Sequence, residues 1–207
     1  SYFLFSIKIE DLDFIDFPLG DFTKNEIRDL AKNMHFHLHD KADSQDICFI
    51  PDGDYKKFIK KSIKKPSKGE IVDLANNVLE NHEGIYNFTI GQRRGLGISK
   101  DKPMYVKEID SKSNRVIVAL KDEVCSKSFL VKDINYLTEL NSSNIKVRVR
   151  STGNFLNAKI EKTDNSHATI ILDQPENAIS PGQACVFYNK DNNGMRLLGG
   201  GWIDSTN

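Results

Sequence analysis

Residues 184–203, ACVFYNKDNNGMRLLGGGWI, decide the fold of this 207-residue chain. Two apolar runs, 184–188 and 197–203, flank the pair Asn193-Gly194, and such a pair between apolar runs is a strong short-range sign of a β-hairpin. The β-branched and aromatic residues of the first run also favour a strand. This stretch therefore predicts an antiparallel sheet in the last part of the sequence.

The same pattern recurs upstream. Further strand-like segments, separated by turn residues, lie at 104–109, 115–120, 145–150, 157–161 and 168–172. Short strands at such regular spacing predict a small closed antiparallel β-barrel, which we place at residues 102–207.

Two basic features of the sequence are open to more than one interpretation. Arg148 and Arg150 would project from one face of their strand, either as ordinary solvent-facing side chains or as a pair of phosphate contacts. The loop 90–98, IGQRRGLGI, has three glycines and two adjacent arginines. It fits a tight structural turn or a contact with a phosphate backbone.

The first 52 residues open on the strand-like or core-like run 2–5, and a stretch of helical periodicity follows. Thr23 and Glu26 have the spacing of a capping box, and the apolar positions 27, 30, 31 and 34 then follow on one face. We expect residues 1–52 to be the end of an α/β unit, followed by a small β-rich central domain at 53–101. The chain starts at Ser1, without a methionine, which suggests a fragment of a longer protein.

Composition limits the class of protein. The 29 Lys and Arg residues balance the 29 Asp and Glu residues, so any electrostatic binding face requires local segregation of charge. Three cysteines without C-x-x-C spacing argue against a secreted disulfide framework and favour a reducing, cytoplasmic setting. No apolar run approaches a membrane span, and we expect neither a metal site nor a membrane partner.

Cys48 stands where a polar, acidic run, 43–46, meets an apolar run. One interpretation is a small buried hydrophobe. The other is a reactive thiol that the core holds and solvent reaches, which requires a lowered thiol pKa. The residue types alone leave both open.

Several segments, in their order along the chain, together resemble the bacterial tRNA-specific 2-thiouridylases; these segments are 1–4, 17–20, 43–50, 53–55, 89–98, 181–184 with 186–188, and 198–203. The resemblance implies an α+β fold that is mainly β. Its parts would be the tail of an α/β ATP-pyrophosphatase (adenine nucleotide α-hydrolase-like) domain, the central domain and the C-terminal antiparallel β-barrel.

The resemblance also implies a reaction, the ATP-dependent 2-thiolation of the wobble uridine of tRNA. ATP with Mg²⁺ would adenylate the uridine C2 oxygen, and Cys48 matches the cysteine that carries the persulfide. The family's ATP-binding Ser-Gly-Gly-Val-Asp-Ser motif and its first catalytic cysteine are absent from this sequence. We therefore expect this chain alone to be inactive, and neither Cys125 nor Cys185 matches the first cysteine.

For tRNA contacts the resemblance points to Arg148, Val149 and Gln183, and strand alternation adds Arg150. The central-loop residues Gln92, Arg93 and Arg94 are further candidates. The implied partners are tRNA and a persulfide-carrying donor protein, with the enzyme a monomer. The alternative is a catalytically silent β-barrel RNA-binding module in which Cys48 is structural.

Overall fold

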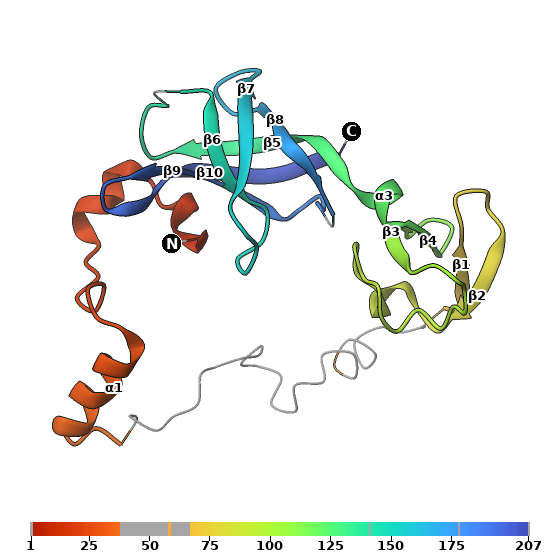
Figure 1. The fold of residues 1–207 in the computed structure, drawn as a ribbon, viewed down its shortest axis with the longest axis horizontal. Coiled ribbons are helices and arrows are strands. Elements are labelled where there is room, and N and C mark those ends of the chain that lie inside the picture. Colours follow the sequence, from red (N-terminus) through yellow and green to blue (C-terminus); the bar gives the residue numbers. More distant parts are fainter. Residues whose placement is uncertain (1, 38–57, 59–66, 141, 178, 207) are drawn as a thin grey trace. The chain divides into compact units, whose positions relative to one another are not determined.

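The computed structural model describes residues 2–37, 58, 67–140, 142–177 and 179–206 (Figure 1). The chain divides into two compact units, one of Ser1–Ile9 with Lys65–Asn207 and the other of Glu10–Lys64. Among the described residues, no helix has the length and apolar character needed to cross a membrane.

A closed six-stranded barrel occupies the C-terminal part of the first unit. Its strands run in the spatial order β10-β5-β8-β7-β6-β9, and each neighbouring pair is antiparallel. The prediction of an antiparallel barrel is confirmed. The strands are β5 (Ser126–Tyr136), β6 (Asn144–Arg148), β7 (Leu156–Lys162), β8 (Ala168–Glu176), β9 (Ala184–Asp191) and β10 (Gly194–Thr206).

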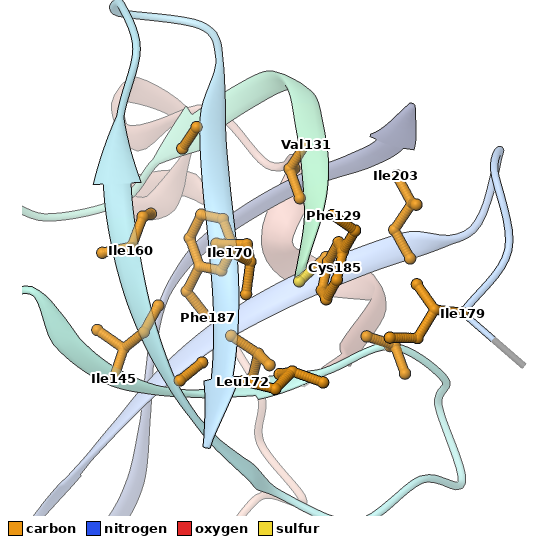
Figure 2. Close-up of a cluster of buried hydrophobic side chains, with 14 of the residues drawn as sticks. Phe129, Val131, Ile145, Ile160, Ile170, Leu172, Ile179, Cys185, Phe187 and Ile203 are labelled. Carbon is orange, nitrogen blue, oxygen red and sulfur yellow. The ribbon is translucent and has the colours of Figure 1, made fainter. Parts of the chain in front are cut away.

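The hairpin predicted at 184–203 is the β9–β10 pair. Gly194 pairs with Asp191, so two residues connect the strands. The barrel interior is filled by alternate side chains of its strands, among them Phe129, Ile170 and Phe187, which are fully buried (Figure 2). Cys185 lies in this core, as its apolar strand predicts.

A separate four-stranded sheet has the order β2-β1-β4-β3. Its strands are β1 (Gly69–Val72), β2 (Val78–His82), β3 (Met104–Asp110) and β4 (Arg115–Leu120), and the short helices η3 (Ile85–Asn87) and α3 (Lys121–Val124) follow β2 and β4. β1 pairs with β4 in parallel, and the other pairs are antiparallel.

This pairing differs from the expectation that the barrel domain begins at residue 102. β3 and β4 form the expected hairpin, but they join β1 and not the barrel. The reason is packing, because Val106, Val116 and Val118 share a core with Ile71 and Leu96. Glu70 and Arg115 are paired in the register of β1 with β4, and an ion pair of 2.8 Å between their side chains stabilises this register.

The second unit contains α1 (Lys24–Asn33) and all of η2 (Ile9–Phe14) except its first residue. The predicted capping box of α1 is present: the backbone N–H of Thr23 donates to Glu26 Oε2 at 2.6 Å, and Glu26 N–H donates to Thr23 Oγ1 at 3.4 Å. Leu30 and Met34, on the apolar face of α1, are exposed. The helix is therefore fixed by its local signals and not by burial in the described structure.

The first residues of the chain pack on the barrel. η1 (Tyr2–Ser6) contacts β10 and β5, and we call residues 2–7 the strap. The sequence predicted a strand-like or core-like start; the segment is a 3₁₀ helix that buries Tyr2 and Phe5. These two side chains cluster with Ala184, Val186 and Tyr188, which alternate along β9 with the core residues and so face outward from the barrel.

Candidate functional site

Cys48, the predicted catalytic residue, lies outside the described residues, as does the whole stretch 43–50 around it. The other two cysteines are free thiols. Burial raises the pKa of the Cys185 thiol far above its usual range, and burial is also the main cause that raises the pKa of Cys125. The Cys125 thiol donates to the carbonyl oxygen of Lys121 at 3.2 Å. Neither environment favours a thiolate, which is the nucleophilic form.

An open cleft of about 370 Å³ lies on the barrel beside the strap. We call it the strap cleft. It is lined by Tyr2, Phe3 and Phe5 of the strap, by residues 149–152 after β6, by residues 182–184 at the start of β9, and by Trp202 of β10. The structure thus brings three of the predicted tRNA contacts, Val149, Arg150 and Gln183, to one cleft.

Three hydrogen bonds hold the strap against the barrel. The Tyr2 hydroxyl donates to the carbonyl oxygen of Ala184 at 2.7 Å. The side-chain amide of Asn135 donates to the carbonyl oxygens of both Phe5 and Ile7, each at 2.7 Å. Burial is the main cause that raises the pKa of Tyr2 to about 12, so its hydroxyl stays protonated and remains a donor.

The glycines of β10 make room for this contact. A Cβ atom on Gly200 would lie 2.7 Å from the carbonyl oxygen of Cys185 and 2.9 Å from the Phe5 ring. Gly199 has a φ of +140°, and a Cβ atom there would collide with the carbonyl oxygen of Asn135. The Phe5 ring also meets Trp202 edge to face, with 5.5 Å between ring centroids. The glycine run therefore forms the seat of the strap.

The two arginines that were predicted to act as a pair contact different residues of the protein. Arg148, the last residue of β6, places its guanidinium 4.0 Å from the centre of the Phe155 ring. Arg150 lies beyond the strand end, and its Nη2 is 3.6 Å from Glu176 Oε1 and 3.4 Å from Asn177 Oδ1. Val149, between them, is buried in the barrel core, so a contact of Val149 with RNA would use its backbone.

Gln183 belongs to a tight turn that closes one side of the strap cleft. Its backbone N–H donates to Ser180 at 3.2 Å, and its carbonyl oxygen accepts from the N–H of Ile203 at 2.8 Å. Its side-chain Oε1 is buried and has no hydrogen-bond partner among the described residues. Buried acceptors of this kind are costly unless a ligand or water satisfies them.

Gln92 differs from its two arginine neighbours. Its side chain accepts from the N–H of Thr89 at 3.0 Å and donates to the carbonyl oxygen of Arg94 at 2.9 Å, so it ties the loop together. Arg93 and Arg94 are exposed. Arg93 lines a second cleft, of about 300 Å³, with Lys100, Asp101 and Lys102. The structure therefore supports a loop-holding role for Gln92 and leaves the arginines available to a ligand.

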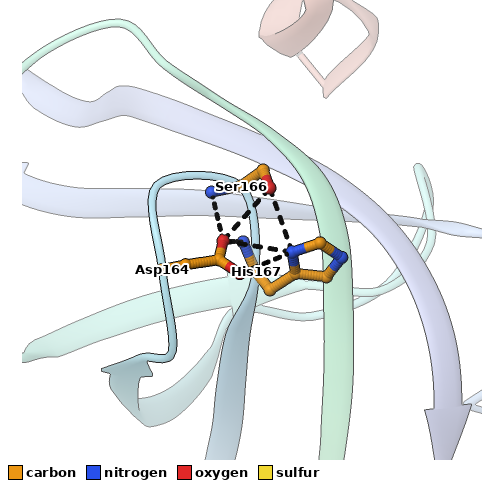
Figure 3. A network of polar contacts seen from close by, with 3 residues as sticks. All are labelled: Asp164, Ser166 and His167. Carbon is orange, nitrogen blue, oxygen red and sulfur yellow. Dashed lines mark hydrogen bonds and ion pairs between the residues drawn. The ribbon is translucent and has the colours of Figure 1, made fainter.

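Asp164, Ser166 and His167 resemble a catalytic triad in composition but not in geometry (Figure 3). Ser166 Oγ and both Asp164 oxygens approach the same nitrogen, His167 Nδ1, at 2.9–3.1 Å. A triad needs the nucleophile and the carboxylate on opposite ring nitrogens. Asp164 also accepts from the backbone N–H groups of Ser166 and His167, and these bonds hold its pKa at about 2. The group is a turn that joins β7 to β8.

The N-terminus of α1 does not fit a nucleotide-phosphate site. The N-terminus of α1 would be the natural anion site, but the Glu26 carboxylate already accepts from the Thr23 N–H there. A second carboxylate or phosphate at this position would repel the first. The N-terminus of α1 is therefore not suited to the phosphates of the expected ATP.

Sequence reasoning missed the aromatic wall of the strap cleft. Phe3 and Trp202 lie in segments quoted for the resemblance, yet they are 199 positions apart, from residue 3 to residue 202, and nothing in their spacing joins them. The available signal was the glycine run before Trp202, since three glycines in a strand indicate close approach of another segment.

Three protein families match successive parts of the chain. Residues 1–52 match the family described as tRNA methyl transferase HUP domain, and residues 56–120 the tRNA methyl transferase PRC-barrel domain. Residues 126–203 match the aminomethyltransferase beta-barrel domain. The last two ranges agree with the division between the four-stranded sheet and the barrel.

Similar proteins extend along nearly the whole chain. tRNA-specific 2-thiouridylase MnmA of Rickettsia typhi is 45% identical over 98% of this chain and 57% of its own length. The proteins of the same name from Rickettsia prowazekii and Anaplasma marginale are 44% and 41% identical, over 99% and 98% of this chain and 58% and 52% of their own lengths. The chain thus spans little more than half the length of these curated relatives.

Proposed function

The chain belongs to the tRNA-specific 2-thiouridylase family, and from that premise we propose that it supplies the sulfur-carrying cysteine and a tRNA-docking surface for 2-thiolation of the wobble uridine. The observation that carries this proposal is the likeness to these relatives along almost the entire chain. The enzyme would be a tRNA-uridine 2-sulfurtransferase.

The family descriptions name methyl transfer, whereas the relatives are named for thiolation. We favour thiolation because identity above 40% over the full chain is a closer relation than a match to a domain family. A cysteine at position 48 also suits sulfur chemistry, since thiols and persulfides are strong nucleophiles.

In this proposal ATP and Mg²⁺ belong to a part of the enzyme outside the described residues, where adenylation would turn the uridine C2 oxygen into a leaving group. Cys48 would carry a persulfide, and its terminal sulfur would attack C2. The C2–S bond forms and the C2–O bond breaks. The thiolate of a second cysteine then attacks the Cys48 sulfur, so that a disulfide forms and the transferred sulfur stays on the uridine.

The second cysteine is neither of the other two in this chain. Cys185 is fully buried in the barrel core, and the Cys125 thiol is bonded to the carbonyl oxygen of Lys121. We propose that this cysteine and the ATP site lie elsewhere in the enzyme, so the 207-residue chain alone should not thiolate tRNA.

The strap cleft supports the docking part of the proposal. It places Arg150 and Gln183 side by side with aromatic side chains, and such combinations bind single-stranded nucleic acid. The proposed partners are tRNA and a persulfide-carrying donor protein. We propose further that the enzyme acts as a monomer in the cytoplasm.

The same cleft also supports the second candidate function, a catalytically silent RNA-binding module. Nothing in the cleft requires Cys48, so RNA docking could persist without sulfur transfer. The two functions differ in what Cys48 does. Under the module hypothesis, Cys48 would matter only to stability.

The deciding experiment measures sulfur transfer by the intact parent enzyme and by its Cys48→Ser variant. ATP, Mg²⁺, a persulfide donor and an unmodified tRNA transcript are supplied, and 2-thiouridine is quantified by mass spectrometry after nuclease digestion. Cys125→Ser serves as the matched control. Loss of product only with Cys48→Ser, with tRNA binding intact, supports sulfur transfer; equal product from all three proteins would reduce the chain to a docking module.

A further inference from the structure

Two aromatic side chains of the strap cleft are unusually accessible. Trp202 is 42% exposed and Phe3 is 75% exposed, and both line the cleft. They come from opposite ends of the chain, one from β10 and the other from the strap. Large exposed aromatic faces that gather in one concavity mark a surface for a ligand.

The Trp202 ring is held in place before any ligand arrives. Phe5, which is only 4% exposed, packs its ring edge to face against Trp202. Phe5 is itself fixed by the Asn135 amide and by the Gly200 seat. A rigid aromatic face loses little entropy on stacking, so it binds a flat ligand more tightly than a mobile one does.

The polar lining of the cleft selects the type of flat ligand. Of the described residues that line it, Arg150 alone has an ionised side chain, and Ser151, Thr152 and Gln183 supply neutral hydrogen-bonding groups. No carboxylate is among these described lining residues, so a polyanion meets no repulsion from the cleft wall. Arg150 forms a long ion pair of 3.6 Å with Glu176, and the carboxylate partly offsets the attraction of the guanidinium for a phosphate. Stacking rather than charge should therefore provide most of the affinity.

We propose that the strap cleft binds an unpaired nucleotide of RNA, whose base stacks on Trp202 and Phe3 while its polar edge and phosphate meet Gln183 and Arg150. This inference rests on the proposed tRNA docking and adds a specific subsite to it. A base inside a duplex cannot offer both faces to aromatic side chains, so the ligand is a nucleotide in a loop or a single-stranded end.

The test uses the 207-residue chain and the fluorescence of Trp202, its sole tryptophan. Titration with an unmodified tRNA transcript should quench the emission, because a stacked base quenches indole. A blunt RNA duplex of equal length and charge should bind more weakly and leave the emission unchanged. Affinities are measured in parallel with an end-labelled RNA, so that variants without tryptophan can be compared.

Three variants and one control separate stacking from other roles. Phe3→Ala and Trp202→Ala should each weaken tRNA binding by roughly 5- to 150-fold, the range for loss of one base–aromatic stack. Trp202→Phe keeps an aromatic face and should retain most of the affinity. The control is Phe14→Ala, which removes an 89% exposed aromatic side chain outside the cleft and should change nothing.

Each other outcome overturns the inference in a recognisable way. If tRNA binds but none of the cleft variants changes its affinity, docking stands and the stacking subsite is wrong. If the wild-type chain binds no tRNA, the docking proposal and the subsite both fail. If Phe3→Ala instead abolishes self-association measured by sedimentation, a second copy of the chain occupies the cleft and the nucleotide does not.

Discussion

The hydroxyl group of Tyr2 donates a hydrogen bond of 2.7 Å to the carbonyl oxygen of Ala184, which joins two positions 182 residues apart. Ala184 directly follows Gln183 and begins β9. The strap therefore anchors the strand next to the turn that carries a proposed tRNA contact. Any change that loosens the strap should therefore lower the stability of the barrel and alter the shape of the strap cleft.

Replacement of Tyr2 by phenylalanine tests this anchor. Tyr2→Phe keeps the ring in the cluster with Phe5 and Tyr188 and removes only the hydroxyl, so we expect the free energy of unfolding to fall by about 1 kcal/mol. Urea denaturation followed by far-UV circular dichroism measures the change. Phe14→Leu, at an 89% exposed position outside the strap, is the control and should leave the midpoint unchanged. An equal loss in both variants would mean that the hydroxyl is not the anchor.

The seat of the strap predicts a strong effect for one added methyl group. In Gly200→Ala the new Cβ atom would lie within 3 Å of both the Cys185 carbonyl oxygen and the Phe5 ring. We expect a loss of about 1–3 kcal/mol, typical of overpacking, together with a shift of Trp202 emission as Phe5 moves away. Gly153→Ala is a milder comparison, because its nearest neighbour would be a carbonyl oxygen at 3.2 Å. A stable Gly200→Ala protein with unchanged emission would contradict the proposed seat.

How far the sequence predicts this structure depends on how local each signal is. The capping box of α1 and the β9–β10 hairpin are confirmed, because neighbouring residues determine them. β5, an eleven-residue strand, was not predicted, since its apolar positions are interrupted by Lys127, Lys132 and Asp133. Its place in the sheet depends on partners at 168–176 and 199–206, which no local pattern reveals.

The candidate site shows the same limit. Alternation predicted that Arg148 and Arg150 share a strand face, but β6 ends at Arg148 and Arg150 lies beyond it. Each of the two has its own partner within the protein. The assignment of β3 and β4 to the barrel failed because a strand pattern does not state which sheet the strand joins. The role of Cys48 stays a prediction, because residues 38–57 are outside the described structure.

Substitutions in the loop 89–98 should distinguish the structural role of Gln92 from a direct role of Arg93 and Arg94 in RNA binding. Gln92→Ala removes both hydrogen bonds that tie the loop, so we expect faster amide hydrogen exchange across residues 89–98 and a loss of about 1–2 kcal/mol in stability. Any loss of tRNA affinity would then follow the loosening of the loop. Unchanged exchange with weaker tRNA binding would instead make Gln92 a direct contact.

Arg93→Gln and Arg94→Gln are the matched variants of the same loop. Both side chains are exposed, so stability should stay within about 0.5 kcal/mol of the wild type. If an arginine contacts an RNA phosphate, its loss should reduce the dependence of log affinity on log salt by about 0.7–0.9. Trp202→Ala should leave this slope nearly unchanged, since stacking releases few ions. An unaltered slope in both arginine variants would exclude the loop from phosphate binding.

The buried side chain of His82 should make the stability of the four-stranded sheet depend on pH. The side chain is 5% exposed; its Nδ1 accepts from the N–H of Gly84 at 3.0 Å, and its ring packs edge-on near Phe88. Burial lowers the pKa of His82 below its ordinary 6.5, although the charge of Glu83 opposes the shift. Between the two pKa values the unfolded chain binds more protons than the folded one, so stability is fully present above about pH 6.5 and falls as the pH decreases toward the folded pKa.

The stability lost through protonation of His82 can be separated from the stability lost when the carboxylates of the same sheet are protonated. Hydrogen bonds lower the pKa of Asp73 and Asp110 from 3.8, so the stability that they contribute is lost only at more acidic pH. Urea denaturation between pH 7 and pH 5 therefore isolates the histidine. In His82→Gln, which cannot titrate, the decline over this interval should disappear, whereas His167→Gln in the exposed turn should retain it. An identical decline in His82→Gln and the wild type would show that another group is responsible.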